Sequence, residues 1–130
     1  MKTTDFRIGN YVQHIPTKTL CRVSELTGEA SCISADEVER YGHTIRRDLE
    51  PILLREKWFG LLGFENYFTS DPQDRGAGRC FNIGNFKVYM PNEDYYRFIY
   101  NINDEETVEL EYVHQLQNLY FVIKGRELKL

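Results

Sequence analysis

The sequence predicts an α+β protein: an N-terminal SH3-like β-meander or small barrel, then a helix, an antiparallel sheet and a C-terminal helix. Short β-favouring segments joined by tight turns fill the first third, aromatic-rich segments fill the middle, and a segment with helical periodicity lies near the end. The chain has 130 residues, of which 42% are hydrophobic and 28% charged, so it is long enough to fold without a metal or disulfide. We expect residues 1–50 to form the β-meander subdomain and residues 51–130 an α+β subdomain packed with it as one globular unit.

The first subdomain is predicted as a meander of three short strands that curls into a small SH3-like barrel. Alternation and β propensity place these strands at residues 7–15, 20–26 and 30–34. Curling of such a sheet would close its edges. Ser34 and Glu37 have capping-box spacing, which predicts a short helix over residues 35–41. Residues 43–49 fit either a strand or irregular structure.

A helix is predicted after Pro51, followed by aromatic-rich strands. Four apolar residues recur at helical spacing, namely Leu54, Trp58, Leu61 and Leu62. Gly63 supplies a left-handed stop. Gly60 costs about 1 kcal/mol relative to Ala within a helix, which points to close packing or to tolerance. The strands that follow are expected at residues 64–69, 79–83, 86–90 and 95–100.

The clearest helix prediction covers residues 112–124. Its apolar positions fall within an arc of about 120°, and they are Tyr112, Val113, Leu116, Leu119, Tyr120 and Ile123. Gly125 marks the end of the helix. A short final strand is expected over residues 126–130.

The outer face of this last helix is the most informative functional feature. His114, Asn118 and Phe121 lie opposite the apolar stripe, and Gln117 lies beside them. Solvated helix faces usually carry Glu–Lys pairs, but the only charged residue in this helix is Lys124. Two interpretations stay open: the four residues form an interface with a protein partner or another copy of the chain, or the helix is sandwiched between two layers of its own domain.

Charge disfavours nucleic acid as a partner. The formal net charge is −4, and residues 59–130, with 7 basic and 11 acidic side chains, account for all of it. Phosphate contacts use Lys and Arg, so such contacts would fall to the densest basic group, which is Arg40, Arg46, Arg47, Arg55 and Lys57. This group supports an alternative function as a weak nucleic-acid-binding module. A solvated, salt-paired surface is the plainer interpretation.

The sequence holds no recognisable catalytic, cofactor or metal-binding motif. We therefore expect no cofactor, no metal and no enzymatic activity. Residues 74–79, DRGAGR, resemble a phosphate cradle, but strand-like residues follow where a helix would be needed. A third alternative is an enzyme with a Cys–His pair, because such partners meet only in the fold. Three dispersed cysteines and no long apolar segment fit a soluble cytoplasmic protein.

Three blocks of the sequence carry a resemblance to a known group of proteins. They are RIGNYV at residues 7–12, PILLREKWFGLLGF at residues 51–64 and EYVHQLQNLYFVIKGREL at residues 111–128, of which HQLQNLYF is the most specific. Together they resemble small proteins of unknown function that Bacteroidetes bacteria encode widely, often near prophage or mobile-element genes. Arg55 departs from the pattern of that group, which has a Thr helix cap there. The resemblance implies a bacterial or phage cytoplasmic setting and supplies no catalytic residue.

The predicted function is that of a non-enzymatic binding or adaptor protein that acts through its C-terminal helix. The resemblance adds a regulatory role in a phage or mobile element. The candidate interface residues fall inside its most specific string, which fits either a special interface or an obligatory packing joint.

Overall fold

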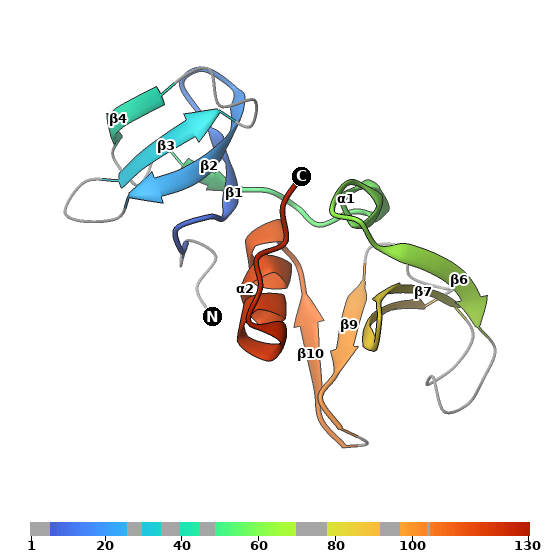
Figure 1. Ribbon diagram of the computed structural model, residues 1–130. Coiled ribbons are helices and arrows are strands. Elements are labelled where there is room, and N and C mark those ends of the chain that lie inside the picture. The colour runs from blue at the N-terminus through green and yellow to red at the C-terminus, as the bar shows by residue number, and fades with distance from the viewer. Residues whose placement is uncertain are drawn as a thin grey trace. The chain divides into compact units, whose positions relative to one another are not determined.

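The structure is a computed structural model that describes residues 6–25, 30–34, 40–44, 49–69, 78–91, 97–103 and 105–130. Within these ranges the chain forms two antiparallel five-stranded sheets and two helices, so the predicted α+β class is confirmed (Figure 1). The chain divides into two compact units. Unit 1 combines residues 1–53 with residues 112–128, and unit 2 combines residues 54–111 with residues 129–130. The C-terminal helix thus belongs to the unit of the N-terminal strands, whereas the sequence-based boundary grouped it with residues 51–130.

The sheet of unit 1 has the strand order β4-β3-β2-β1-β5. Its strands are β1 (Tyr11–His14), β2 (Thr19–Glu25), β3 (Ala30–Ser34), β4 (Arg40–Thr44) and β5 (Leu49–Pro51). The first three strands form the predicted meander, and β5 returns to pair with β1, with Val12 opposite Pro51. No closed barrel is seen among the described strands, so the SH3-like detail stays a prediction. The short helix predicted over residues 35–41 is wrong at its end, because Arg40 and Tyr41 belong to β4; residues 35–39 lie outside the described part.

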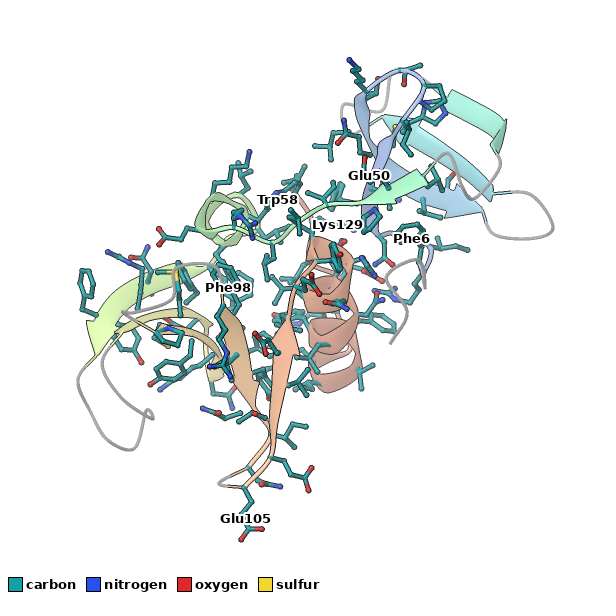
Figure 2. All side chains as sticks on the ribbon, turned by 180° about the vertical axis from the view of Figure 1, so that it is seen from behind. Phe6, Glu50, Trp58, Phe98, Glu105 and Lys129 are labelled. Carbon is teal, nitrogen blue, oxygen red and sulfur yellow. The ribbon has the colours of Figure 1, made fainter. Side chains whose placement is uncertain are left out.

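The core of unit 1 lies on one face of this sheet. Cys21 and Val23 alternate with more accessible residues along β2, and both are fully buried, as expected for a strand with one face turned inward. They form a cluster with Phe6, which is labelled in Figure 2, and with Val12 and Leu49. This cluster holds β1 and the segment before it against β2 and β5, its two neighbours in the sheet.

Unit 2 contains the second sheet, with the order β10-β9-β8-β7-β6. The strands are β6 (Glu65–Thr69), β7 (Gly78–Ile83), β8 (Phe86–Pro91), β9 (Phe98–Asn101) and β10 (Thr107–Leu110). The predicted strands at residues 64–69, 79–83 and 86–90 agree with the observed ones within a residue. Gly84 has φ +57° and turns the chain between β7 and β8, which only a residue tolerant of positive φ does without strain.

A short helix, α1 (Glu56–Leu61), supplies the aromatic centre of unit 2. The Phe59 ring stacks on Phe81 with centroids 4.3 Å apart and touches Phe64 and Phe98, each at 5.2 Å. Trp58 and Phe98, both labelled in Figure 2, are also buried. These rings join α1 to the sheet of its own unit.

The C-terminal helix, α2, runs from Val113 to Lys124 and starts one residue later than the predicted 112–124. Tyr112 is its N-cap, and its backbone N–H donates to the Gln115 side chain at 3.1 Å. Gly125 ends the helix with φ +70° and donates its N–H to the Phe121 carbonyl. The strand predicted over residues 126–130 is wrong, since that segment pairs with no strand. In the described ranges no helix is both long enough and apolar enough to cross a membrane.

Candidate functional site

The four α2 residues predicted to face a partner have different environments. His114 and Gln117 are fully buried, Asn118 is half-buried, and Phe121 is 39% exposed. The prediction that His114 and Gln117 face outward is wrong. The buried side of α2 contains Val113, His114, Leu116, Gln117 and Tyr120. With a turn of 100° per residue, the centre of this buried side lies about 70° around the helix axis from the centre of the predicted apolar stripe.

The Gln117 amide is buried because it completes the backbone hydrogen bonds of two other segments. Its Oε1 accepts from the Tyr11 backbone N–H at 2.8 Å. Its Nε2 donates to the Gly9 carbonyl at 3.1 Å and to the Leu128 carbonyl at 3.2 Å. Buried backbone groups must find partners, and the left-handed Gly9, with φ +96°, interrupts the regular pairing just before β1. One side-chain amide therefore bridges the start of β1 and the segment after α2.

Asn118 and Arg7 continue this set of hydrogen bonds toward the protein surface. Asn118 Oδ1 accepts from Asn10 Nδ2 at 2.8 Å and from Arg7 Nε at 3.0 Å. The Arg7 guanidinium also pairs with the Glu127 carboxylate, with Nη2 donating to Oε2 at 3.0 Å. It lies 4.3 Å from the centre of the Phe121 ring, a distance suited to a cation–π contact. Arg7 thus ties α2 to the segments that come before β1 and after α2.

His114 is enclosed by rings of its own unit. Its imidazole lies edge-on to Phe6, with centroids 5.0 Å apart, and stacks on Tyr112 at 5.8 Å. The strings RIGNYV and HQLQNLYF therefore contact each other directly, through Arg7, Gln117 and their neighbours. For His114 and Gln117 this contact agrees with the second interpretation, packing within their own unit, and it accounts for the missing ionic side chains on that side of α2.

A different part of α2 remains exposed. Val122 is 80% exposed, Ile123 43% and Phe121 39%, while Leu119 is half-buried. We call these four residues the apolar end of α2. Leu119, Val122 and Ile123 have the i, i+3, i+4 spacing of one helix face. Sequence periodicity missed this surface because it assigned Leu119 and Ile123 to the core.

The basic group proposed for nucleic acid is only partly described. Arg46 and Arg47 lie outside the described residues, and of Arg40 only its place in β4 is known. Arg55 is half-buried and its Nη1 donates to the Leu54 carbonyl at 2.8 Å, while Lys57 is exposed on α1. The grouping of all five side chains therefore stays a prediction.

The described cysteines are poorly placed for nucleophilic chemistry. Cys21 and Cys80 are fully buried, as is His114, and His14 is 7% exposed. A reactive thiolate needs access to its substrate and a favourable electrostatic environment. Across the described ranges, no group of three His, Cys, Asp or Glu side chains is placed to hold a metal ion. Comparisons of the chain with protein-family models, curated proteins and solved structures give no match.

Proposed function

We propose that this protein is a non-enzymatic binding or adaptor protein whose contact with a protein partner is the apolar end of α2. The observation that supports this most is Val122, which is 80% exposed on a helix whose only charged residue is Lys124. Contiguous exposed apolar side chains often mark interaction sites. Covering them gains about 25 cal/mol for each Å² of apolar surface removed from water.

The shape of this surface indicates how a partner would bind. Leu119, Val122 and Ile123 form the kind of stripe that one helix presents to an apolar groove. The Arg7–Glu127 ion pair lies beside Phe121 and supplies a polar rim, as interfaces commonly have. The partner we propose is a protein with an apolar groove bordered by polar groups. The resemblance of the sequence to the Bacteroidetes group supports a cytoplasmic setting in a bacterium or phage.

Charge reversal at the exposed position tests the proposal. Val122→Glu should leave the fold intact because the side chain makes few internal contacts, and it should reduce partner capture from native bacterial lysate about tenfold, a loss of about 1.4 kcal/mol. Ile8→Glu is the matched control, since Ile8 is also an exposed apolar residue of unit 1. Capture is quantified by mass spectrometry, and sedimentation velocity detects self-association.

The proposal requires a protein that the wild type and Ile8→Glu retain and Val122→Glu loses. Equal recovery of the same proteins by the wild type, Ile8→Glu and Val122→Glu would exclude the apolar end of α2 as the contact. A monomeric wild type that captures no protein would refute the binding function itself.

A further inference from the structure

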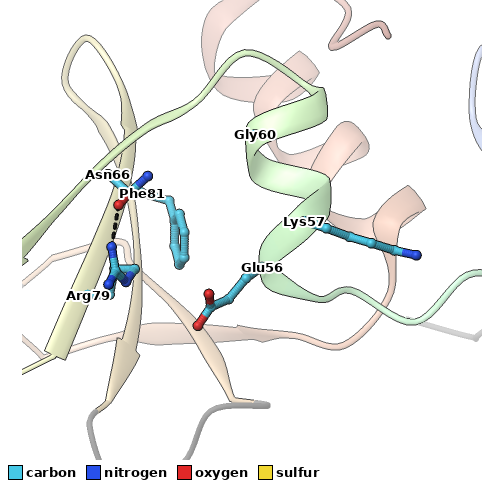
Figure 3. Close-up of a pocket in the computed structure, with 6 residues that line it drawn as sticks. All are labelled: Glu56, Lys57, Gly60, Asn66, Arg79 and Phe81. Atoms are coloured by element: carbon cyan, nitrogen blue, oxygen red, sulfur yellow. Dashed lines mark hydrogen bonds between the residues drawn. The ribbon is translucent and has the colours of Figure 1, made fainter.

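A pocket of about 430 Å³ opens in unit 2 between α1 and the neighbouring strands (Figure 3). It is lined by Glu56, Lys57, Gly60, Asn66, Arg79 and Phe81. Its volume lies in the range of small-molecule sites. One sequence feature lies at this pocket, since Arg79 is the last residue of the DRGAGR string considered for phosphate binding.

Arg79 is held in place with most of its donors available. Its Nη1 donates to Asn66 Oδ1, and its guanidinium lies 4.1 Å from the centre of the Phe68 ring. The register of β6 and β7 sets both contacts, because Phe68 stands opposite Arg79 and Asn66 opposite Phe81. A guanidinium has five N–H donors. Among the described residues Arg79 forms no ion pair with a carboxylate, so it can still bind an anion through its planar fork.

The other walls of the pocket define the kind of anion. Phe81 lines the pocket with the small part of its ring that is accessible, since the side chain is 3% exposed and stacked on Phe59. Figure 3 shows the Glu56 carboxylate directed toward the side that holds Arg79, whereas Lys57 is directed away. The Glu56 carboxylate offsets part of the attraction that Arg79 exerts on an anion. A planar carboxylate matches the guanidinium fork of Arg79, and an apolar group attached to it would add contact with Phe81.

Gly60 provides an independent reason to expect a ligand. A Cβ built on Gly60 meets no atom within 4 Å, and its φ is not positive. Neither the backbone nor close packing therefore requires glycine at this position, although glycine weakens a helix relative to alanine. Gly60 is one of the residues that line the pocket, so the missing side chain leaves room for a molecule beside the backbone of α1.

We propose that this pocket binds a small carboxylate with an apolar body. The carboxylate pairs with the free N–H groups of Arg79, and the apolar body lies on Phe81 and over Gly60. This site is in unit 2 and is independent of the apolar end of α2, so either proposal can fail without the other.

The probe is 3-phenylpropionate, titrated into the ¹⁵N-labelled full-length chain and followed by NMR. Wild type should show saturable amide shifts near residues 56–60, 66 and 79–81, with a Kd on the order of 1 mM. The neutral analogue 3-phenylpropanamide should bind about tenfold more weakly, because it lacks the charge that Arg79 recognises.

Two variants and one control locate the site. Arg79→Lys should weaken binding about tenfold, because lysine keeps the charge and loses the fork. Gly60→Leu should abolish binding by filling the pocket, without lowering Tm, because leucine is the better helix former. Arg97→Gln is the control: Arg97 is an exposed residue of the same unit, paired with Glu109, and its loss should leave the affinity unchanged.

Absence of saturable shifts up to about 20 mM probe, roughly twentyfold above the expected Kd, would overturn the proposal. Equal binding of the acid and its amide would overturn it too. The proposal would also be overturned if Arg79→Lys or Gly60→Leu bound 3-phenylpropionate with wild-type affinity.

Discussion

The Gln117 amide shows how a polar side chain becomes a structural residue of the core. Its three hydrogen bonds reach the backbone of Gly9, Tyr11 and Leu128. Gly9 and Tyr11 lie more than 100 positions before Gln117, and Leu128 lies 11 positions after it. A buried group that loses its hydrogen-bond partner incurs the cost of its desolvation, about 1–3 kcal/mol.

Gln117→Leu should lower the free energy of unfolding by about 2–4 kcal/mol, because three backbone groups lose their partner. Gln115→Leu is the matched control on the same helix. Gln115 is half-buried and its Oε1 accepts from the Tyr112 N–H, so its loss should cost about 0.5–1 kcal/mol, as for other helix caps. Urea denaturation measures both values. Equal decreases in the free energy of unfolding for the two variants would show that the Gln117 amide is not the main hydrogen-bonding group between α2 and the start of β1.

At the scale of elements, α2 illustrates what sequence periodicity predicts and what it does not. Both ends were predicted to within one residue, because the start of the apolar pattern and Gly125 are local signals. The buried face was not, since periodicity treats imidazole and amide groups as solvent-facing. Gln117 and Asn118 are buried or half-buried by hydrogen bonds to residues 106–111 positions away, and no local pattern reveals such partners.

The same limit explains two further differences. The predicted strand at residues 126–130 is absent, and the Leu128 carbonyl accepts from Gln117 instead of from a neighbouring strand. Leu119 and Ile123 were assigned to the core because aliphatic residues at helical spacing normally lie there, whereas Leu119 is half-buried and Ile123 is exposed beside Val122. The pocket beside Arg79 depends on the pairing of β6 with β7 and on the position of α1, which composition does not encode.

Gly125→Ala should destabilise the protein by about 1 kcal/mol, because alanine is strained at φ +70° whereas glycine is not. Gly125→Asn should recover part of that loss, since asparagine tolerates the left-handed region. Thermal unfolding followed by circular dichroism measures both variants. Alanine as stable as glycine would mean that α2 can end without this cap.

Phe59→Ala should cost about 3–5 kcal/mol, the usual range for deleting a buried phenylalanine. Its ring is fully buried against three other rings of unit 2. Leu61→Ala is the control on α1, since Leu61 is 55% exposed, and it should stay within about 0.5 kcal/mol of wild type. A similar loss at the two positions, measured by urea denaturation, would contradict the aromatic centre described for unit 2.

At the scale of the whole molecule, the main part of unit 2, residues 54–111, is inserted in the sequence between the two parts of unit 1. Hydrogen bonds close each unit where the chain crosses between them. Within unit 1, the Val113 N–H donates to the Ile52 carbonyl at 2.8 Å. Within unit 2, the Leu54 N–H donates to the Glu111 carbonyl at 2.9 Å. In each unit, therefore, a hydrogen bond joins the two chain segments at which the unit begins and ends. Compact units of this kind often unfold separately.

Amide hydrogen exchange tests this independence with variants already defined. Phe59→Ala should speed exchange in residues 54–111 and have little effect on β1, β2 and α2, whereas Gln117→Leu should do the reverse. The expected acceleration in the affected unit is tenfold or more, because about 1.4 kcal/mol corresponds to a factor of ten. Uniform acceleration across the chain by both variants would show that the two units unfold as one.

Net charge gives a whole-molecule prediction about nucleic acid. The chain carries a formal charge of −4, so nonspecific duplex binding should be undetectable near physiological salt, about 150 mM. Fluorescence anisotropy of a labelled duplex measures this. Binding that weakens steeply with salt, and that Arg55→Gln with Lys57→Gln reduces, would support the nucleic-acid alternative instead.

The bond from Tyr11 to Gln117 also sets an order of events during synthesis. The two residues are 106 positions apart, so a ribosome that adds about 5–20 residues per second makes them roughly 5–20 s apart. All of residues 54–111 are translated in that interval. We therefore expect residues 54–111 to fold first on the nascent chain. The hydrogen bond between β1 and α2 can form only after α2 has been synthesised.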